Sequence, residues 1–296
     1  MSQPEPETIP ARLRADDPRL IYCSVTGFGQ TGPYAERAGY DLMVQAMCGL
    51  MSITGEKGRG PMRVGIPIND LTAGNLLALG IMMKLYDRER TGQGGLVHAS
   101  LLETGLWSNG FMVQAALCGA TFYPRPPRES LPNALTGYYR CRDDRWLILT
   151  ILNEERQWPV FATSLGLERL IADPRFAAQK ERFANSPALI AELDAAFATR
   201  DRDDWRKVLT AAGIVFEIVA SAEDVPNDQQ AIDNGILVPI AGQDTLTVSS
   251  PFYVAGQEKV APRRAPDIGQ DSDAILSEAG FDAQAIAGLR AGKVIG

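Results

Sequence analysis

The sequence contains very little histidine and cysteine, and both shortages exclude large classes of function. His98 is the only histidine in 296 residues, which excludes most Ser-His-Asp hydrolases and nearly all zinc chemistry. The four cysteines, Cys23, Cys48, Cys118 and Cys141, are scattered, and none stands in a Cys-x-x-Cys pair. We therefore expect no disulfide framework and no metal, and we predict buried, reduced thiols.

We also expect neither a leader sequence nor a membrane helix. Residues 1–8 are polar and acidic, without the basic and apolar regions of a signal peptide. No stretch has the length of uninterrupted apolar residues that a membrane helix needs, and a net charge of −7 opposes non-specific binding to nucleic acid. We expect a cytoplasmic protein with neither membrane nor nucleic acid as a partner. Arg37, Arg59 and Arg63 are local cations that could hold a small anionic ligand.

The first element that the sequence predicts is a buried strand at residues 20–26, a short run rich in β-branched and aromatic side chains. Gly27, Gly29 and Gly32 then spell the G-x-G-x-x-G pattern of a dinucleotide site. A true fingerprint opens a helix at its third glycine, but Pro33 follows Gly32 directly. We expect a tight turn and a close backbone approach here, without nicotinamide binding.

A single carboxylate, Asp70, lies between the apolar run 64–68 and residues 71–86, which predict a long buried helix. Gly92 and the basic residues just before it are ordinary helix stop signals. Asp70 is thus expected at or near the helix N-cap, where its oxygen can accept a free backbone N–H. The positive end of the helix dipole also favours an ionised carboxylate. The local sequence leaves both readings open, a cap or a nucleophile.

Composition changes at residues 123–130, a proline-rich stretch that predicts a linker. The runs at 137–141 and 145–150 flank two aspartates and predict a β-hairpin. Further helices are expected around 155–165, 187–200 and 202–212, and the chain ends in an amphipathic helix near 271–292. His98 lies in an alternating run and is expected to be a strand residue with a satisfied ring.

Several segments together resemble the class III CoA-transferase family, also called the CaiB/BaiF family. The matching segments are 18–34, 39–42, 65–71, 89–94, 173–176, 228–235 and 268–269 with the helix that follows. The resemblance implies an α/β fold with a Rossmann-like large domain and a smaller α+β domain. The first part of the large domain would be residues 1–122, and residues 123–130 would form a linker. The small domain would be residues 131–222. A return segment, residues 223–296, would pack its C-terminal helix on the large domain.

The resemblance also implies a chemistry, CoA transfer between an acyl-CoA and a small carboxylic acid. In this family the aspartate at the position of Asp70 attacks the thioester and gives an aspartyl-acyl anhydride. The released CoA thiolate then forms an aspartyl-CoA thioester, which the acceptor carboxylate attacks. Residues Arg37, Ala38, Gly39 and Tyr40 match a segment that lines the CoA site and are the implied CoA contacts. For Tyr40, covering the start of a helix is the alternative interpretation.

Other readings of the resemblance stay open. Related α-methylacyl-CoA racemases carry a histidine where this chain has Tyr40, and a tyrosine with a reference pKa of about 10 is a poor base at neutral pH, so transfer is favoured over racemisation. Glu154 and Glu155 lie near a racemase glutamate and are interpreted as helix-start carboxylates. Family members form interlocked homodimers and carry about a hundred further N-terminal residues, without which sheet edge and apolar surface are exposed. A catalytically silent truncated dimer subunit is therefore the other alternative.

Overall fold

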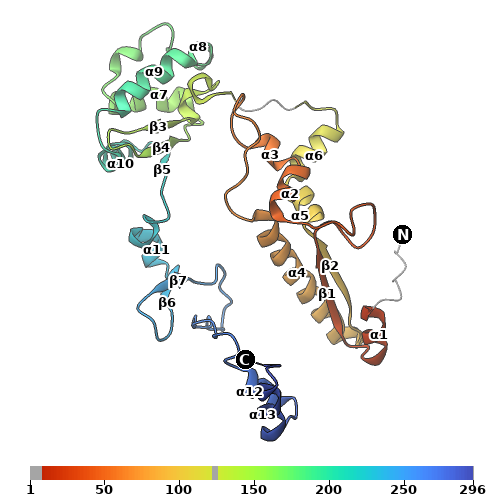
Figure 1. Ribbon diagram of the computed structural model, residues 1–296. Helices are drawn as coiled ribbons and strands as arrows, with labels where there is room; N and C mark the ends of the chain where they lie inside the picture. Colours follow the sequence, from red (N-terminus) through yellow and green to blue (C-terminus); the bar gives the residue numbers. More distant parts are fainter. Residues whose placement is uncertain (1–8, 122–125, 296) are drawn as a thin grey trace. The chain divides into compact units, whose positions relative to one another are not determined.

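The computed structural model describes residues 9–121 and 126–295. The chain divides into two compact units, Met1–Ile218 and Val219–Gly296. Within the first unit, two hydrophobic clusters form around different elements of the chain. Figure 1 shows the order of the elements along the chain. Residues 122–125, which include the first three residues of the predicted linker 123–130, lie outside the described residues. The predicted bounds of the large domain, linker, small domain and return segment stay predictions.

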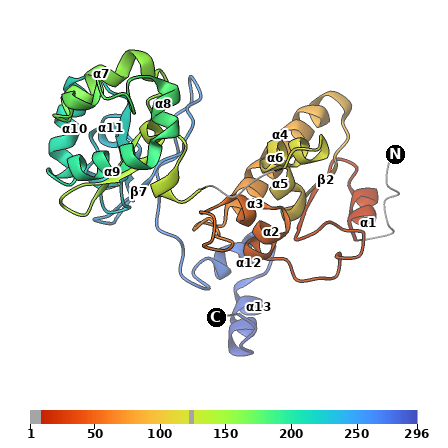
Figure 2. The ribbon, with the colours of Figure 1, turned by 90° about the horizontal axis from the view of Figure 1, so that it is seen from above.

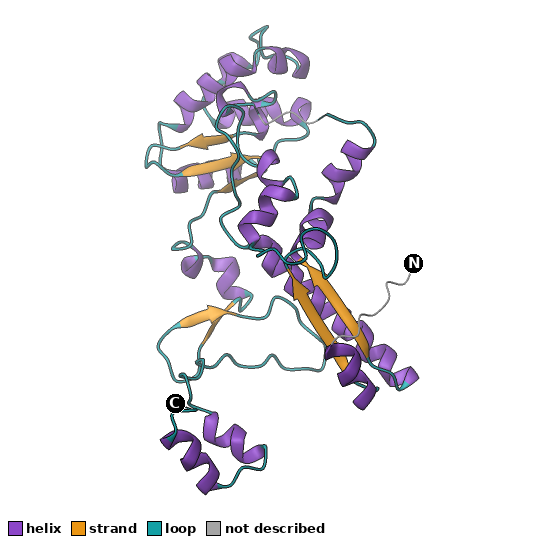
Figure 3. Ribbon diagram, turned by 45° about the vertical axis from the view of Figure 1, so that its right-hand side comes forward, coloured by secondary structure: helices purple, strands orange, loops and turns teal. Residues whose placement is uncertain are grey.

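The part of the first unit before residue 122 is built on a parallel pair of strands. Its elements are α1 (Ile9–Asp16), β1 (Ile21–Thr26), α2 (Asp41–Met47), α3 (Leu50–Ile53), α4 (Ile68–Thr91), β2 (Gly95–Ser100), α5 (Leu101–Ser108) and α6 (Gly110–Leu117). β1 and β2 pair in parallel along their whole length, from Ile21 opposite Gly95 to Thr26 opposite Ser100. The strand predicted at residues 20–26 is therefore confirmed as β1, but its predicted burial is wrong, because its residues are only half-buried or exposed. Figure 3 shows the pair lying along α4.

Helix α4 packs closely on this sheet through a glycine. A Cβ on Gly80 would lie only 2.7 Å from Cγ1 of Val97 in β2, so the absence of a side chain lets helix and strand approach. Elsewhere on α4, Met82, Met83 and Tyr86 are 62–69% exposed. The prediction that this helix is buried nearly all round is wrong, because the strand pair and the neighbouring helices cover only part of its circumference.

The part of the first unit from residue 126 to 218 combines a small antiparallel sheet with several helices. Its elements are η1 (Arg128–Ser130), η2 (Ala134–Thr136), β3 (Tyr138–Arg140), β4 (Trp146–Leu149), α7 (Glu154–Ser164), η3 (Glu168–Leu170), α8 (Gln179–Ala184), α9 (Ser186–Phe197), α10 (Arg202–Ala211) and β5 (Phe216–Ile218). The strands lie in the order β3-β4-β5, and both pairings are antiparallel. The predicted hairpin is confirmed as β3 and β4, and Figure 2 shows the helices gathered in this part of the chain.

An aromatic cluster fills the centre of this part. Phe197 is fully buried and stacks on Tyr139 with ring centroids 5.0 Å apart. It also meets Trp205 edge to face at 5.2 Å, and the indole Nε1 of Trp205 donates a hydrogen bond to the Phe197 carbonyl oxygen at 2.8 Å. The polar atom of Trp205 is thus satisfied, so this indole contributes apolar burial without an unpaired donor.

The second unit contains short elements: η4 (Val225–Asn227), α11 (Gln229–Asp233), β6 (Leu237–Pro239), β7 (Leu246–Val248), α12 (Ser272–Glu278) and α13 (Ala283–Ala291). β6 and β7 form an antiparallel pair. The helix predicted near 271–292 is two helices, because Gly280 adopts a φ of 90° after α12 and Asp282 accepts the Ala285 N–H as the cap of α13. Across the part of the chain that the structure describes, no helix is both long enough and apolar enough to cross a membrane.

Candidate active site

The candidate nucleophile, Asp70, lies in the first turn of α4 and not at its N-cap. The helix begins at Ile68, and Pro67 occupies the N-cap position, so Asp70 is the third helical residue. A third-position carboxylate can reach back to the N-cap N–H, but proline has none. The carboxylate of Asp70 is exposed, and it has no hydrogen bond or ion pair among the described residues. The predicted capping role is therefore wrong, and this carboxylate is left free.

A second carboxylate, Asp41 at the start of α2, supplies the acceptor that α4 needs. Its Oδ1 accepts the backbone N–H of Asn69 at 2.7 Å, and its Oδ2 accepts Nε2 of Gln45 at 2.6 Å. Gln45 is 1% exposed, and its Oε1 accepts the Val64 N–H at 2.9 Å. These bonds tie α2 to the segment leading into α4, so they fix the position of the helix turn that carries Asp70.

The surroundings of Asp70 in the protein favour the neutral form of its carboxyl group more than water does. Loss of solvent on one side, and then the negative charge of Asp41, raise the pKa of Asp70 above its usual value. A higher pKa makes the ionised carboxylate a stronger base and a better nucleophile. The N-terminal position on α4 acts in the opposite sense, because the helix dipole favours a charged carboxylate.

The segment predicted to line the CoA site is held against the turn after β1. A Cβ on Gly27 would lie 2.6 Å from the Cα of Gly39, so the two backbones are in direct contact, as the glycine pattern predicts. The guanidinium of Arg37 lies over the ring of Tyr34, 4.6 Å from its centroid, and over the ring of Phe28 at 5.6 Å. The cation is therefore oriented by two aromatic faces while it remains exposed to solvent.

The structure brings this segment and the candidate nucleophile together. Tyr40 is the residue before Asp41, and Asp41 is bonded to the residue before Asp70. Tyr40 is the N-cap of α2, forms no side-chain cap hydrogen bond and is 67% exposed, so its ring does not seal the helix start. Ala38 is exposed and Gly39 half-buried. Of the other predicted cations, Arg59 and Arg63 are exposed on the segment that leads to α4.

The contact between the two glycines gives a stability prediction. Gly27→Ala is expected to destabilise the chain by about 2 kcal/mol, because the added methyl group must push a backbone and not a flexible side chain. Gly74→Ala in α4 is the matched control, since a Cβ there meets nothing within 4 Å, and it should stabilise the helix by about 0.5–1 kcal/mol. Denaturant unfolding of both variants tests this; equal effects would contradict the close-contact assignment.

The G-x-G-x-x-G pattern does not form a dinucleotide cradle. Gly29 and Gly32 have φ values of 101° and 90°, which only glycine adopts readily. The next helix after Gly32 is α2, which begins at Asp41, so the third glycine does not open a helix as a dinucleotide fingerprint requires. The glycines make a turn, as predicted.

Glu154, which lies near a racemase glutamate in the resemblance, is buried in an ion pair. Its Oε2 lies 3.1 Å from Nε of Arg182, and the two side chains are 1% and 2% exposed. Nδ2 of Asn133 donates a second bond to its Oε1 at 2.7 Å. Glu155 accepts the Gln179 N–H at 2.7 Å. Both glutamates start α7 as predicted, but no pattern in the sequence indicates that Glu154 is buried with an arginine.

The histidine and cysteines are only partly where the sequence places them. His98 is a strand residue of β2 as predicted, with Nε2 at 3.7 Å from Oε2 of Glu103, which is beyond hydrogen-bond distance. All four cysteines are free, but Cys23 and Cys118 are exposed. The prediction of buried thiols is wrong for these two, because Cys23 lies on the uncovered side of β1 and Cys118 follows the end of α6. Among the described residues, no group of three or more potential ligands is arranged for a metal ion.

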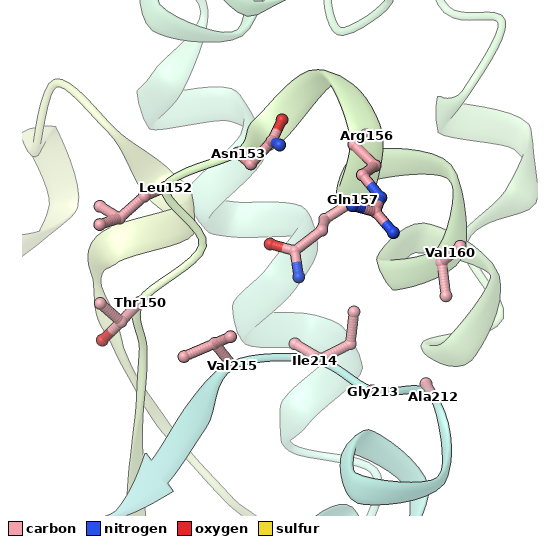
Figure 4. Close-up of a pocket in the computed structure, with 10 residues that line it drawn as sticks. All are labelled: Thr150, Leu152, Asn153, Arg156, Gln157, Val160, Ala212, Gly213, Ile214 and Val215. Carbon is pink, nitrogen blue, oxygen red and sulfur yellow. The ribbon is translucent and has the colours of Figure 1, made fainter.

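A separate pocket of about 600 Å³ lies in the part of the chain that follows residue 126. Figure 4 shows side chains from the start of α7 facing those of the segment before β5. Its lining residues are Thr150, Leu152, Asn153, Arg156, Gln157, Val160, Ala212, Gly213, Ile214 and Val215. None of the predicted site residues lines it, and the sequence offered no signal for it because its two walls are more than fifty positions apart.

Comparison with known proteins finds relatives that match most of this chain. The chain is 33% identical to an acyl-CoA transferase from Fusarium pseudograminearum over 96% of its own length and 63% of that relative's. It is 31% identical to the mouse succinyl-CoA:glutarate CoA-transferase over 88% of its length and 60% of that relative's. The chain thus spans less than two thirds of these two proteins. A human α-methylacyl-CoA racemase also matches, with 26% identity over 97% of the chain and 74% of the racemase.

The fold leads to the same family. A CaiB/BaiF family protein from Brucella suis superimposes with a TM-score of 0.83 and 31% identity, covering 90% of this chain and 70% of that one. The family model described as CoA-transferase family III matches residues 7–272. The fold class predicted from the resemblance, a mixed α/β fold of this family, is therefore confirmed, and the chain belongs to CoA-transferase family III.

Proposed function

We propose that this chain transfers CoA from an acyl-CoA to a carboxylic acid with Asp70 as the nucleophile. The observation that supports this most strongly is the free carboxylate itself: Asp70 stands exposed in the first turn of α4 while Asp41 supplies the acceptor for the helix N-terminus. A carboxylate without a structural partner, at a helix end that favours its ionised form, is suited to attack an electrophilic carbonyl carbon.

The reaction proceeds through two covalent states of Asp70. The carboxylate attacks the acyl carbonyl, the C–S bond breaks, and CoA leaves as a thiolate from an aspartyl-acyl anhydride. The thiolate attacks the aspartyl carbonyl, which releases the first carboxylate and leaves an aspartyl-CoA thioester. The acceptor carboxylate repeats the sequence in reverse. The net exchange is one acyl-CoA and one acid for the other acyl-CoA and the other acid, so no oxidant, reductant or metal is consumed.

The residues around Asp70 fit a CoA thioester as substrate. CoA carries negatively charged phosphate groups, and Arg37, Arg59 and Arg63 are exposed cations on segments that lead to α2 and α4. Arg37 is held over two aromatic rings, so less side-chain freedom is lost when it binds an anion. The exposed ring of Tyr40 offers an apolar face with a hydroxyl group next to Asp41. We assign CoA contacts to Arg37, Ala38, Gly39 and Tyr40 on this basis.

The relatives' names suggest which substrates to test. We expect the chain to exchange CoA between succinyl-CoA and glutarate or other small carboxylic acids, measured by chromatography of the CoA esters. Isotope-labelled acid that enters the CoA ester pool would support transfer. No exchange with any acid, from a chain that is folded, would contradict the proposal and favour a catalytically silent subunit. An interlocked homodimer and a cytoplasmic location remain further proposals.

Racemisation is the second candidate, because a racemase is among the relatives. A racemase must move a proton on and off Cα of an α-methylacyl-CoA, and this chain has Tyr40 where the related enzymes carry a histidine. Glu154 is also committed to Arg182 in a buried pair. Incubation with 2-methylacyl-CoA in D2O is therefore expected to give no deuterium at Cα, and rapid deuterium incorporation would favour racemisation over transfer.

A further inference from the structure

Two carboxylates, Asp41 and Asp70, meet at the N-terminus of α4 and have opposite surroundings. Both oxygens of Asp41 accept hydrogen bonds, from the Asn69 N–H at 2.7 Å and from Nε2 of Gln45 at 2.6 Å. Accepting at both oxygens is the pattern of an ionised carboxylate. The carboxylate of Asp70 accepts no hydrogen bond among the described residues. Both oxygens of Asp41 thus have hydrogen-bond partners in the protein, whereas the carboxylate of Asp70 is available to react.

The position of Asp41 is itself fixed by a buried side chain. Gln45, one turn later in α2, is 1% exposed and bonds Asp41 with its amide nitrogen and the Val64 N–H with its amide oxygen, the latter at 2.9 Å. The same nitrogen lies 3.4 Å from the carbonyl oxygens of Val64 and Ile66. Asp41 and Gln45 therefore clamp the segment that enters α4, and a shift of either would move the turn that carries Asp70.

Loss of solvent, and then the negative charge of Asp41, raise the pKa of Asp70. The other charged groups on the segment that leads into α4 are Glu56, Lys57, Arg59 and Arg63. Helix α5 also packs near this end of α4, and its one acid, Glu103, is bonded to the hydroxyl of Ser100 at 2.7 Å. Asp41 thus acts on the candidate nucleophile in two ways, by geometry and by charge.

We propose that Asp41 is a positioning residue for the nucleophile: it takes the helix-terminal N–H of Asn69 and holds a negative charge beside Asp70, which keeps the Asp70 carboxylate unbonded and reactive. The assignment rests on the proposed function for its catalytic meaning. It goes beyond that function because Asp41 touches neither acyl group nor CoA in the steps above and acts only through Asp70.

The test is Asp41→Asn in the full chain. Asparagine keeps an oxygen for the Asn69 N–H and removes the charge, so the acid limb of the pH profile of kcat/KM for CoA transfer is expected to move to lower pH. The plateau value of kcat/KM is expected to fall about tenfold. The amide nitrogen of asparagine cannot accept the bond from Nε2 of Gln45, which helps to hold the turn that carries Asp70. Asp87→Asn is the matched control, since Asp87 lies near the other end of α4 and pairs with Lys84; it should change neither quantity.

A second readout separates this proposal from the proposed function. The carboxyl carbon of Asp70 can be titrated by NMR in the substrate-free chain, with Asp70→Asn to assign its signal. The midpoint should fall in Asp41→Asn and stay raised in Asp41→Glu, which keeps the charge. If transfer is absent but the midpoint shifts, the proposed function fails and the coupling stands. An unchanged midpoint together with a wild-type pH profile overturns the role of Asp41. Asp41→Ser provides the same test if the asparagine variant does not fold.

Discussion

Asp70→Asn is expected to lower the rate of CoA transfer at least about a thousandfold, because removal of a covalent nucleophile leaves only substrate binding and positioning. The asparagine has almost the same shape, and the acceptor for the α4 N-terminus remains on Asp41. The loss should therefore appear in kcat with little change in KM. Steady-state rates with succinyl-CoA and glutarate measure it, and Asp87→Asn on the same helix serves as the control.

The same substitution should leave the stability of the chain unchanged or slightly higher at neutral pH. The folded-state pKa of Asp70 is raised, so the native state holds this proton more tightly than the unfolded chain does. Stability therefore falls as the pH rises from the ordinary aspartate value through the raised one, and the neutral asparagine avoids this loss. Denaturant unfolding at several pH values would show it. A variant that is both inactive and clearly destabilised would instead support a structural role for Asp70.

Arg182→Met is expected to destabilise the chain by about 3–5 kcal/mol, because it leaves Glu154 buried without its cation. Nε of Arg182 lies 3.1 Å from the carboxylate of Glu154, with both side chains at most 2% exposed. The guanidinium also donates to the Phe176 carbonyl oxygen at 3.0 Å and lies over the ring of Trp158 at 5.3 Å. Methionine keeps an apolar stem of similar length, so the loss reports mainly the charge and its hydrogen bonds.

An exposed ion pair supplies the comparison. Arg169 pairs with Glu192 but is 60% exposed, and Arg169→Met should cost less than about 1 kcal/mol because solvent screens such pairs. The double variant Arg182→Met with Glu154→Gln is expected to recover part of the loss, since the uncompensated charge is gone. If Arg182→Met and Arg169→Met cost the same, Glu154 is not held as the structure indicates, and an active role for it becomes tenable.

The sequence predicts the elements that have strong local patterns. The run at 20–26 forms β1, and the aspartates between 141 and 145 turn the chain between β3 and β4. Long-range consequences are harder to read. The apolar run of α4 predicts burial on every side, but burial depends on what else covers the helix, and periodicity along one segment carries no such information. The C-terminal helix pattern likewise hides the break at Gly280, where a left-handed backbone ends α12.

The sequence predicts Asp70, the main residue of the candidate site, but not the hydrogen bonds that hold the turn around it. Asp70 stands out because it is a lone carboxylate before an apolar helix, but the cap that the pattern suggests is supplied by Asp41, 28 positions before Asn69. No local signal tells which of two carboxylates will bond the Asn69 N–H. The spacing of Asp41 and Gln45, four residues apart in a helix, is consistent with their bond and is the one clue that the sequence contains.

The most direct test of Asp70 as the nucleophile is whether its carboxylate becomes covalently modified during turnover. The chain is incubated with succinyl-CoA, treated with borohydride, digested, and the peptide that carries residue 70 is measured by mass spectrometry. Borohydride reduces an aspartyl thioester to the alcohol, so we expect homoserine in place of Asp70 only when the acyl-CoA is present. An unmodified Asp70 in a chain that transfers CoA at its full rate would contradict its role as the nucleophile.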